Sequence, residues 1–204
     1  MEGLAFDGRK ERANQELGIA MSDILQKLHQ DHIHMAQVLD VLDRQLDIIR
    51  HPESGDDADM NLIRESALYF MTFPDKVHHV AEDKVFEKTE QVAPDMKPQF
   101  EKLRSDHVAL ASVGKEFHEM MDNLCSGQVM QRAELVAEIE KFIDAQREHM
   151  NLEEGKIFPE AKSSLSKTNI DEIEAEYVAS VDPIFGPKVE KYFEQIRQAI
   201  VQET

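Results

Sequence analysis

Residues 31–36 read DHIHMA and residues 78–83 read HHVAED. Residues 106–111, DHVALA, and residues 149–154, HMNLEE, resemble these two stretches and follow in the same order. The first histidines of the paired stretches are separated by 46 residues in one half of the chain and by 42 in the other. Each half is typical of a helical hairpin, and two such hairpins predict a pseudo-symmetric four-helix bundle.

The sequence around these stretches predicts four long amphipathic helices. Apolar side chains recur at spacings of three and four, which places them on one face of each helix. Breaks rich in proline, glycine and aspartate separate the helices. Pro74 predicts a kink or a restart within the second helix, and Gly155 and Pro159 weaken the end of the fourth. The expected helices span residues 15–49, 58–90, 97–124 and 130–161.

The short connections imply antiparallel neighbours. We therefore expect an all-α, up-down-up-down four-helix bundle with a C-terminal helical extension. The expected divisions are a loose N-terminal arm over residues 1–14, the bundle over 15–162 and the extension over 163–204. Within the extension, short helices are expected over 170–178 and 187–201.

The charge and composition exclude several classes of protein. The 204 residues include 41 acidic and 23 basic side chains, which give a net charge of −18. This charge argues against nucleic-acid and anionic-membrane partners, which select basic surfaces. The single cysteine excludes an internal disulfide and a thiolate zinc cluster. No apolar run is long enough to cross a bilayer and no secretory signal is visible, so we expect a cytoplasmic protein.

The repeated histidines and glutamates indicate a metal site. A histidine and a glutamate four residues apart share one helix face, and the two histidines that follow aspartates lie within apolar stripes. Buried carboxylates are costly unless a cation compensates them, and two metal ions would each take two imidazoles, with both carboxylates bridging. Iron, zinc and manganese all suit such ligands. The candidate ligands are His32, His78, Glu82, His107, His149 and Glu153.

The roles of the neighbouring polar residues stay open at this point. His29 lies one turn before the first candidate ligand and is either an additional ligand or an ordinary surface histidine. Other histidines are expected to be partly exposed or to lie behind the ligands, namely His34, His79 and His118. The acids that either accept an imidazole N–H group or face solvent are Asp31, Asp83, Asp106 and Glu154.

Together, these residues resemble the hemerythrin-like (HHE cation-binding) domain family, whose members are four-helix bundles with a non-haem di-iron centre. The resemblance covers about residues 20–162, and the six candidate ligands match the family's ligand positions in order. The segment over residues 182–186, DPIFG, and the helix expected after it resemble the C-terminal extension of a bacterial subgroup.

Two positions differ from the oxygen-carrying members of the family. Those carriers have a fifth histidine one turn after the ligand of the third helix, where this chain has Ala111. Their second bridging residue is an aspartate five residues after the last histidine, whereas Glu153 follows at four. The chain is more similar to the four-His, two-Glu centres of iron–sulfur-centre repair proteins. Those usually carry a cysteine in an N-terminal segment, and here Cys125 is expected in a loop.

The resemblance implies two iron ions per chain with an oxo or hydroxo bridge, and zinc or manganese as substitutes. Each iron would have five ligands and keep one open position. We expect a protein that binds or reduces a small gaseous or peroxide ligand (O2, peroxide or NO) in a stress or redox response. The alternatives are an iron-handling or iron–sulfur-centre repair factor and a metal-state-dependent sensor or interaction module. The sequence leaves enzymatic activity open and identifies no protein partner.

Overall fold

The computed structural model describes residues 23–176 and 181–202. The N-terminal arm expected over residues 1–14 and the start of the first expected helix lie outside the described residues. In the described part the regular structure is helical, which confirms the all-α fold class. The α-helices are α2 (Asp23–Arg50), α3 (Met60–Thr72), α4 (His79–Val92), α5 (Lys97–Cys125), α6 (Arg132–Leu152), α7 (Phe158–Ser164), α8 (Lys167–Glu176) and α9 (Glu194–Val201).

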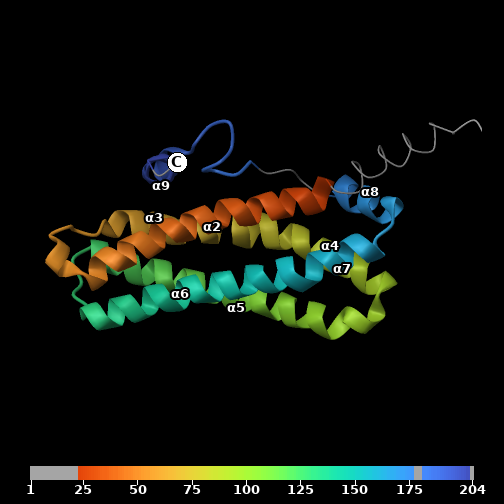
Figure 1. Cartoon of the computed structure of the whole chain (residues 1–204), viewed down its shortest axis with the longest axis horizontal. Helices are drawn as coiled ribbons and strands as arrows, with labels where there is room; N and C mark the ends of the chain where they lie inside the picture. Colours follow the sequence, from red (N-terminus) through yellow and green to blue (C-terminus); the bar gives the residue numbers. More distant parts are fainter. Residues whose placement is uncertain (1–22, 177–180, 203–204) are drawn as a thin grey trace, which may run out of the picture.

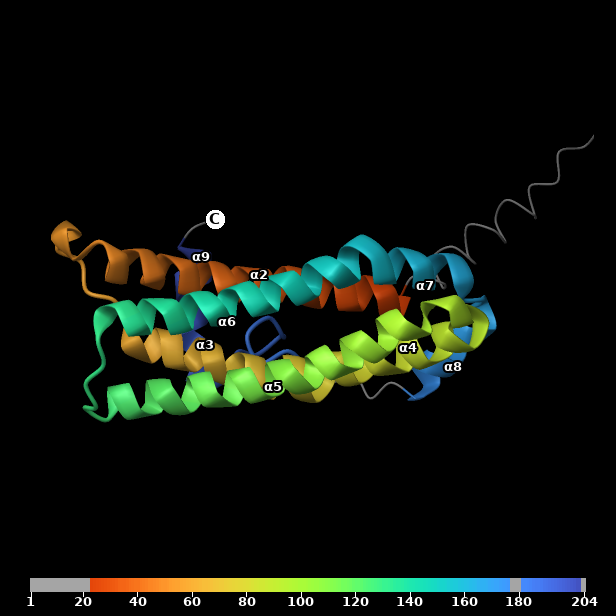
Figure 2. The same cartoon turned by 90° about the horizontal axis from the view of Figure 1, so that it is seen from below.

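Two of the expected long helices are each divided by a π turn. The π turn η2 (Pro74–His78) joins α3 to α4, and η4 (Glu153–Ile157) joins α6 to α7. Short 3-10 turns follow α2 (Pro52–Ser54), precede α5 (Pro94–Met96) and precede α9 (Lys191–Phe193). Figures 1 and 2 show four rods side by side, formed by α2, by α3 with α4, by α5, and by α6 with α7.

The π turn at Pro74 has a local cause. Proline has no backbone N–H to continue the α-helical ladder, and the next turn closes instead by i→i−5 hydrogen bonds. His78 N donates to Phe73 O at 3.2 Å, and the N–H of His79 donates to Pro74 O. The interruption expected at Pro74 is therefore a widened turn rather than a break, and the helix axis continues to the residues of the candidate site.

Side-chain and glycine caps define the ends of the bundle. Asp59 precedes α3, and its Oδ1 accepts from the backbone N–H groups of Asn61 at 2.9 Å and Leu62 at 3.1 Å. Such a cap contributes about 1 kcal/mol. Gly127, in the turn between α5 and α6, has a φ of 98°, a value that glycine adopts without a steric penalty.

A polar layer divides the apolar core into two clusters. One cluster includes Leu39, Phe70 and Phe142, all nearly inaccessible to solvent. The other includes Phe86 and Phe100. Along the chain, four of the six candidate ligands fall between residues of the first cluster and residues of the second, namely His32, His78, His107 and Glu153. The packed clusters therefore hold the polar layer on both sides and away from bulk water.

The C-terminal extension packs on the bundle. Helix α8 contacts α2 and α4, and α9 contacts α2 and α3. The buried Tyr69 hydroxyl donates to Asp182 Oδ2 at 2.9 Å, and the His34 ring stacks on Phe185 with centroids 4.0 Å apart. No described helix is long and apolar enough to cross a membrane.

The expected helix over residues 187–201 begins later than the sequence predicted, with 3-10 residues at 191–193 and α9 from Glu194. Glu190 lies within the expected helix, but its backbone N–H donates to Pro183 O at 2.8 Å, a bond that spans seven residues and is not helical. Just before the expected helix, Asp182 Oδ1 accepts the backbone N–H groups of Ile184 at 2.8 Å and Phe185 at 2.9 Å and forms a local turn.

Candidate metal centre

The six candidate ligands lie together in the polar layer. All six are buried, with at most 7% of each residue exposed. The helices and turns supply them as follows: His32 from α2, His78 from the end of η2, Glu82 from α4, His107 from α5, His149 from α6 and Glu153 from the start of η4.

The carboxylate of Glu82 lies between imidazoles from opposite sides of the bundle. Its Oε1 is 3.1 Å from His78 Nε2 and 3.4 Å from His32 Nε2. Its Oε2 is 3.5 Å from His107 Nε2. The two oxygens of one carboxylate thus face two different groups of imidazoles.

Glu153 repeats this arrangement from the opposite helix. Its Oε2 is 3.4 Å from His32 Nε2, while its Oε1 is 3.5 Å from His107 Nε2 and 3.2 Å from His149 Nε2. Both carboxylates therefore connect the imidazoles of α2 and η2 to those of α5 and α6, as ligands that bridge two ions would.

The spacing of the nitrogen atoms fits a metal ion. His32 Nε2 and His78 Nε2 are 2.9 Å apart, and two nitrogens bound at ~2.1 Å to one ion at a right angle are separated by about 3.0 Å. Both oxygens of Glu82 and of Glu153 are buried without a hydrogen-bond donor among the described residues. Such atoms cost about 1–3 kcal/mol each when unsatisfied, and a cation would compensate them.

Protons compensate the carboxylates in the metal-free site. Burial opposes protonation of His32, but contacts with three carboxylates, Glu153 first, outweigh burial and raise its pKa to about 11. Burial is likewise outweighed at His107, where the contact with Asp83 is the largest favourable effect, and its pKa rises to about 11. Burial and the charge of Glu82 would raise the pKa of Glu153, yet contacts with three imidazoles lower it to about 2.

Three of the acids whose roles were open contact imidazole Nδ1 atoms, so that the Nε2 atoms point into the layer. Such contacts orient histidine ligands and increase their basicity. Asp106 instead contacts Lys102, and His149 Nδ1 has no hydrogen-bond partner among the described residues. The distances are 2.7 Å from His32 Nδ1 to Glu154, 3.3 Å from His78 Nδ1 to Asp31 and 3.1 Å from His107 Nδ1 to Asp83.

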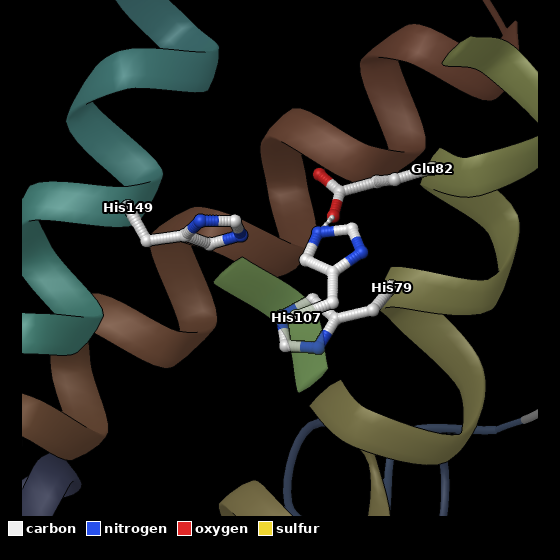
Figure 3. A group of neighbouring side chains, drawn as sticks. All are labelled: His79, Glu82, His107 and His149. Carbon is white, nitrogen blue, oxygen red and sulfur yellow. Dashed lines mark ion pairs between the residues drawn. The ribbon is translucent and has the colours of Figure 1, made fainter. Parts of the chain in front are cut away.

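Two further histidines are placed by the structure. The side chain of His29 is 57% exposed and contacts Glu154 at 3.0 Å, outside the buried layer. His79, expected to be partly exposed or behind the ligands, is buried beside His107 and His149. Ligand atoms of His79, Glu82, His107 and His149 all lie within 4.8 Å of one another (Figure 3). The sequence signal for His79 was its position three residues before Glu82, which also shares a helix face.

A cavity of about 550 Å³ lies between α5 and α6 and reaches His149. Its lining also includes charged residues, among them Lys102 and Glu148. The cavity gives a small molecule space beside one ligand of the candidate centre. Its apolar lining consists of Ala109, Leu110, Val113, Ala145 and Leu152.

Comparison with known families agrees with this geometry. The family model described as the hemerythrin HHE cation binding domain matches residues 23–161, more than half of the chain. The matched range contains all six candidate ligands. No curated protein and no solved structure matches the chain significantly.

Proposed function

This chain belongs to the hemerythrin HHE cation-binding family, and from that premise we propose a non-haem di-iron protein that binds or reduces a small oxidant. The family implies metal binding, and the histidine and glutamate groups in the core can hold metal ions. The proposed oxidants are O2, peroxide and NO, and the proposed role lies in a stress or redox response. A cytoplasmic location stays a prediction from the sequence.

The observation that carries the proposal is the position of the two buried carboxylates. Glu82 and Glu153 each direct one oxygen toward each side of the layer. A single ion would need only one side, whereas two ions need groups that bridge them. Mixed imidazole and carboxylate ligands on facing helices are a known arrangement for pairs of iron ions.

The residues around the centre have separate tasks. His32 and His78 would hold one iron, and His107 and His149 would hold the other. Asp31, Asp83 and Glu154 orient three of these imidazoles through their Nδ1 atoms. A pair of iron ions would supply reversible changes of oxidation state. The carboxylates of Glu82 and Glu153 would supply two negative charges that lower the electrostatic cost of burying these ions.

The cavity is compatible with a small and uncharged ligand. Five of its nine lining residues are apolar, and apolar side chains can contact O2, NO or hydrogen peroxide without the loss of hydration that an ion would suffer there. The net charge of −18 also disfavours anionic substrates. These two features support the proposed class of ligand.

Metal analysis combined with Mössbauer spectroscopy tests the di-iron assignment. We expect about two irons per chain in the purified protein and a loss of iron in Glu82→Gln. A matched exposed variant, Glu148→Gln, should keep both irons. A single stoichiometric zinc, or far less than two irons after reconstitution, would contradict the proposal.

Exposure of the anaerobically reduced protein to oxidants tests the chemistry. We expect irreversible oxidation of the iron by O2 or peroxide, with consumption of the oxidant. An absorption band that forms with O2 and disappears again under argon would favour reversible carriage instead.

A further inference from the structure

His79 is a buried imidazole that the six-residue ligand set leaves without a role. We propose that His79 Nε2 is a fifth imidazole ligand, bound to the ion that His107 and His149 hold. The two ions would then have three and two imidazole ligands, so the centre is unequal. This inference rests on the proposed di-iron site and adds a residue that the resemblance to the family does not supply.

Helix geometry places the adjacent histidines on opposite sides of Glu82. His78 is four residues before Glu82 and His79 is three residues before it. At either spacing the histidine is a neighbour of Glu82 on the helix surface. Consecutive residues differ by about 100° around the helix, so the two rings diverge. The centroid of His78 is 4.7 Å from that of His32, whereas His79 lies 4.3 Å from His107.

The two nitrogens of His79 have environments similar to those of the proposed ligand His107. Its Nδ1 lies 3.4 Å from Asp75 Oδ1, as His107 Nδ1 lies 3.1 Å from Asp83. Its Nε2 is buried and has no hydrogen-bond partner among the described residues. A carboxylate behind Nδ1 and an inward Nε2 are the usual arrangement of a metal-bound histidine.

Binding requires one local change. The rings of His79 and His107 are nearly parallel, at 9°, and Figure 3 shows them one above the other with His149 facing them. Two parallel stacked rings cannot both direct in-plane lone pairs at one ion, so the His79 ring must tilt. The long contact with Asp75, 3.4 Å, permits such a rotation without loss of a strong hydrogen bond.

The other half of the bundle lacks an equivalent residue. His149 corresponds to His78 and Glu153 to Glu82, so Met150 occupies the position that corresponds to His79. Met150 is a buried member of the apolar core. The ion at His32 and His78 therefore gains no third imidazole, and it retains the more open coordination sphere of the two.

Iron-57 Mössbauer spectra and iron titrations of three proteins test the inference. The wild type should bind two irons and give two quadrupole doublets of equal area. In His79→Gln one quadrupole doublet should change and the other should persist. The affinity for one iron should fall by on the order of 100-fold or more, which exceeds the loss of about 10–100-fold expected when a residue that only orients a ligand is replaced. The control His51→Gln, at an exposed histidine that contacts Glu53 outside the buried layer, should match the wild type.

The outcomes separate the two proposals. Fewer than two irons in the wild type would overturn the di-iron function itself. Two irons in the wild type with both doublets and affinities unchanged in His79→Gln would overturn the role of His79 alone. If His79→Gln fails to fold, nitrogen-15 NMR of the zinc-loaded wild type decides, because we expect five metal-bound imidazole Nε2 resonances and four would refute the inference.

Discussion

Metal uptake should release protons from the buried layer, because metal-bound imidazoles must be neutral. In the metal-free protein, His32 and His107 have pKa values of about 11. Both are therefore protonated at pH 8, and their two positive charges offset the two buried carboxylates. Binding of zinc at this pH should release about two protons per chain from these two residues.

The size of the release distinguishes this reasoning from ordinary histidine chemistry. Four imidazoles with the unperturbed pKa of about 6.5 would carry in total only about 0.1 proton at pH 8. A hydroxide that bridges the two ions would add about one proton to either value. The expected total is therefore at least two protons without a bridging hydroxide and at least three with it, because the pKa of His78 is raised as well. Unperturbed imidazoles would give about 0.1 and about 1.1 protons in the same two cases.

Isothermal titration calorimetry of zinc binding in buffers with different ionisation enthalpies measures this number. The slope of the observed enthalpy against the buffer ionisation enthalpy gives the protons released per chain. The number from His32 and His107 should be the same at pH 7 and pH 8, because both values lie far below a pKa of about 11. A release of one proton or fewer at pH 8 would refute the proposed compensation of the buried carboxylates by protons.

Three further measurements check other parts of the structure. Tyr69→Phe should lower the free energy of unfolding by about 1.5–3 kcal/mol, because a buried bond to a carboxylate is lost. The exposed control Tyr192→Phe should stay within about 0.5 kcal/mol in the same denaturant titrations, and equal effects would contradict the first value. Asp83→Asn removes a carboxylate charge next to His107 Nδ1 and should weaken the metal affinity by about 10–100-fold. Asp106→Asn, which contacts Lys102, should leave the metal affinity unchanged. Competition with a chelator measures the affinity of both variants. The raised pKa values of His32 and His107 and the lowered pKa of Glu153 should destabilise the metal-free bundle above pH 6.5 and below pH 4.5, respectively. The pKa values of His32 and His107 are raised to about 11 in the folded protein, so their protonation stabilises the fold. This stabilisation is complete below pH 6.5 and is lost as the pH rises toward 11. The pKa of Glu153 is lowered to about 2, so its ionised form also stabilises the fold. This stabilisation is complete above pH 4.5 and is lost as the pH falls toward 2. A melting temperature of the metal-free protein that rises from pH 6.5 to 9 would be inconsistent with these shifts.

The helical bundle was predictable because the decisive information is local. A histidine and a glutamate four residues apart share a helix face wherever the helix lies, so His78 and Glu82 had to point in one direction. The apolar stripes on either side then had to turn that face inward. Neither step requires knowledge of contacts between distant parts of the chain.

Contacts between distant residues were not predictable. The hydroxyl of Tyr69 donates to Asp182, a residue 113 positions away along the chain. Nothing in the local sequence of either residue identifies the other. The late start of α9 has the same origin, because the backbone N–H of Glu190 donates to Pro183 O, seven residues earlier, and not to a helical carbonyl.

The spacing of the buried positions explains why the helices contain π turns. Buried positions 70, 74, 78 and 82 are separated by three consecutive steps of four, as are 149, 153, 157 and 161. A regular α-helix has 3.6 residues per turn, so such a run would drift around the helix by more than 100°. A turn with one additional residue cancels this drift and keeps the apolar face and the ligand face aligned.

The π turns also determine which insertions and deletions this chain can accept. Removal of one residue between Pro74 and His78 would convert the π turn into an α turn and keep α4 in nearly the same rotational phase relative to α3, because the wider turn absorbs the additional residue. Removal of a second residue would rotate α4 by about 100° relative to α3. Either the apolar face of α3 or the pair His78 and Glu82 would then face away from the core. Related sequences that retain the centre should therefore include chains that are one residue shorter at this turn, with a regular helix in its place, but none that are two residues shorter.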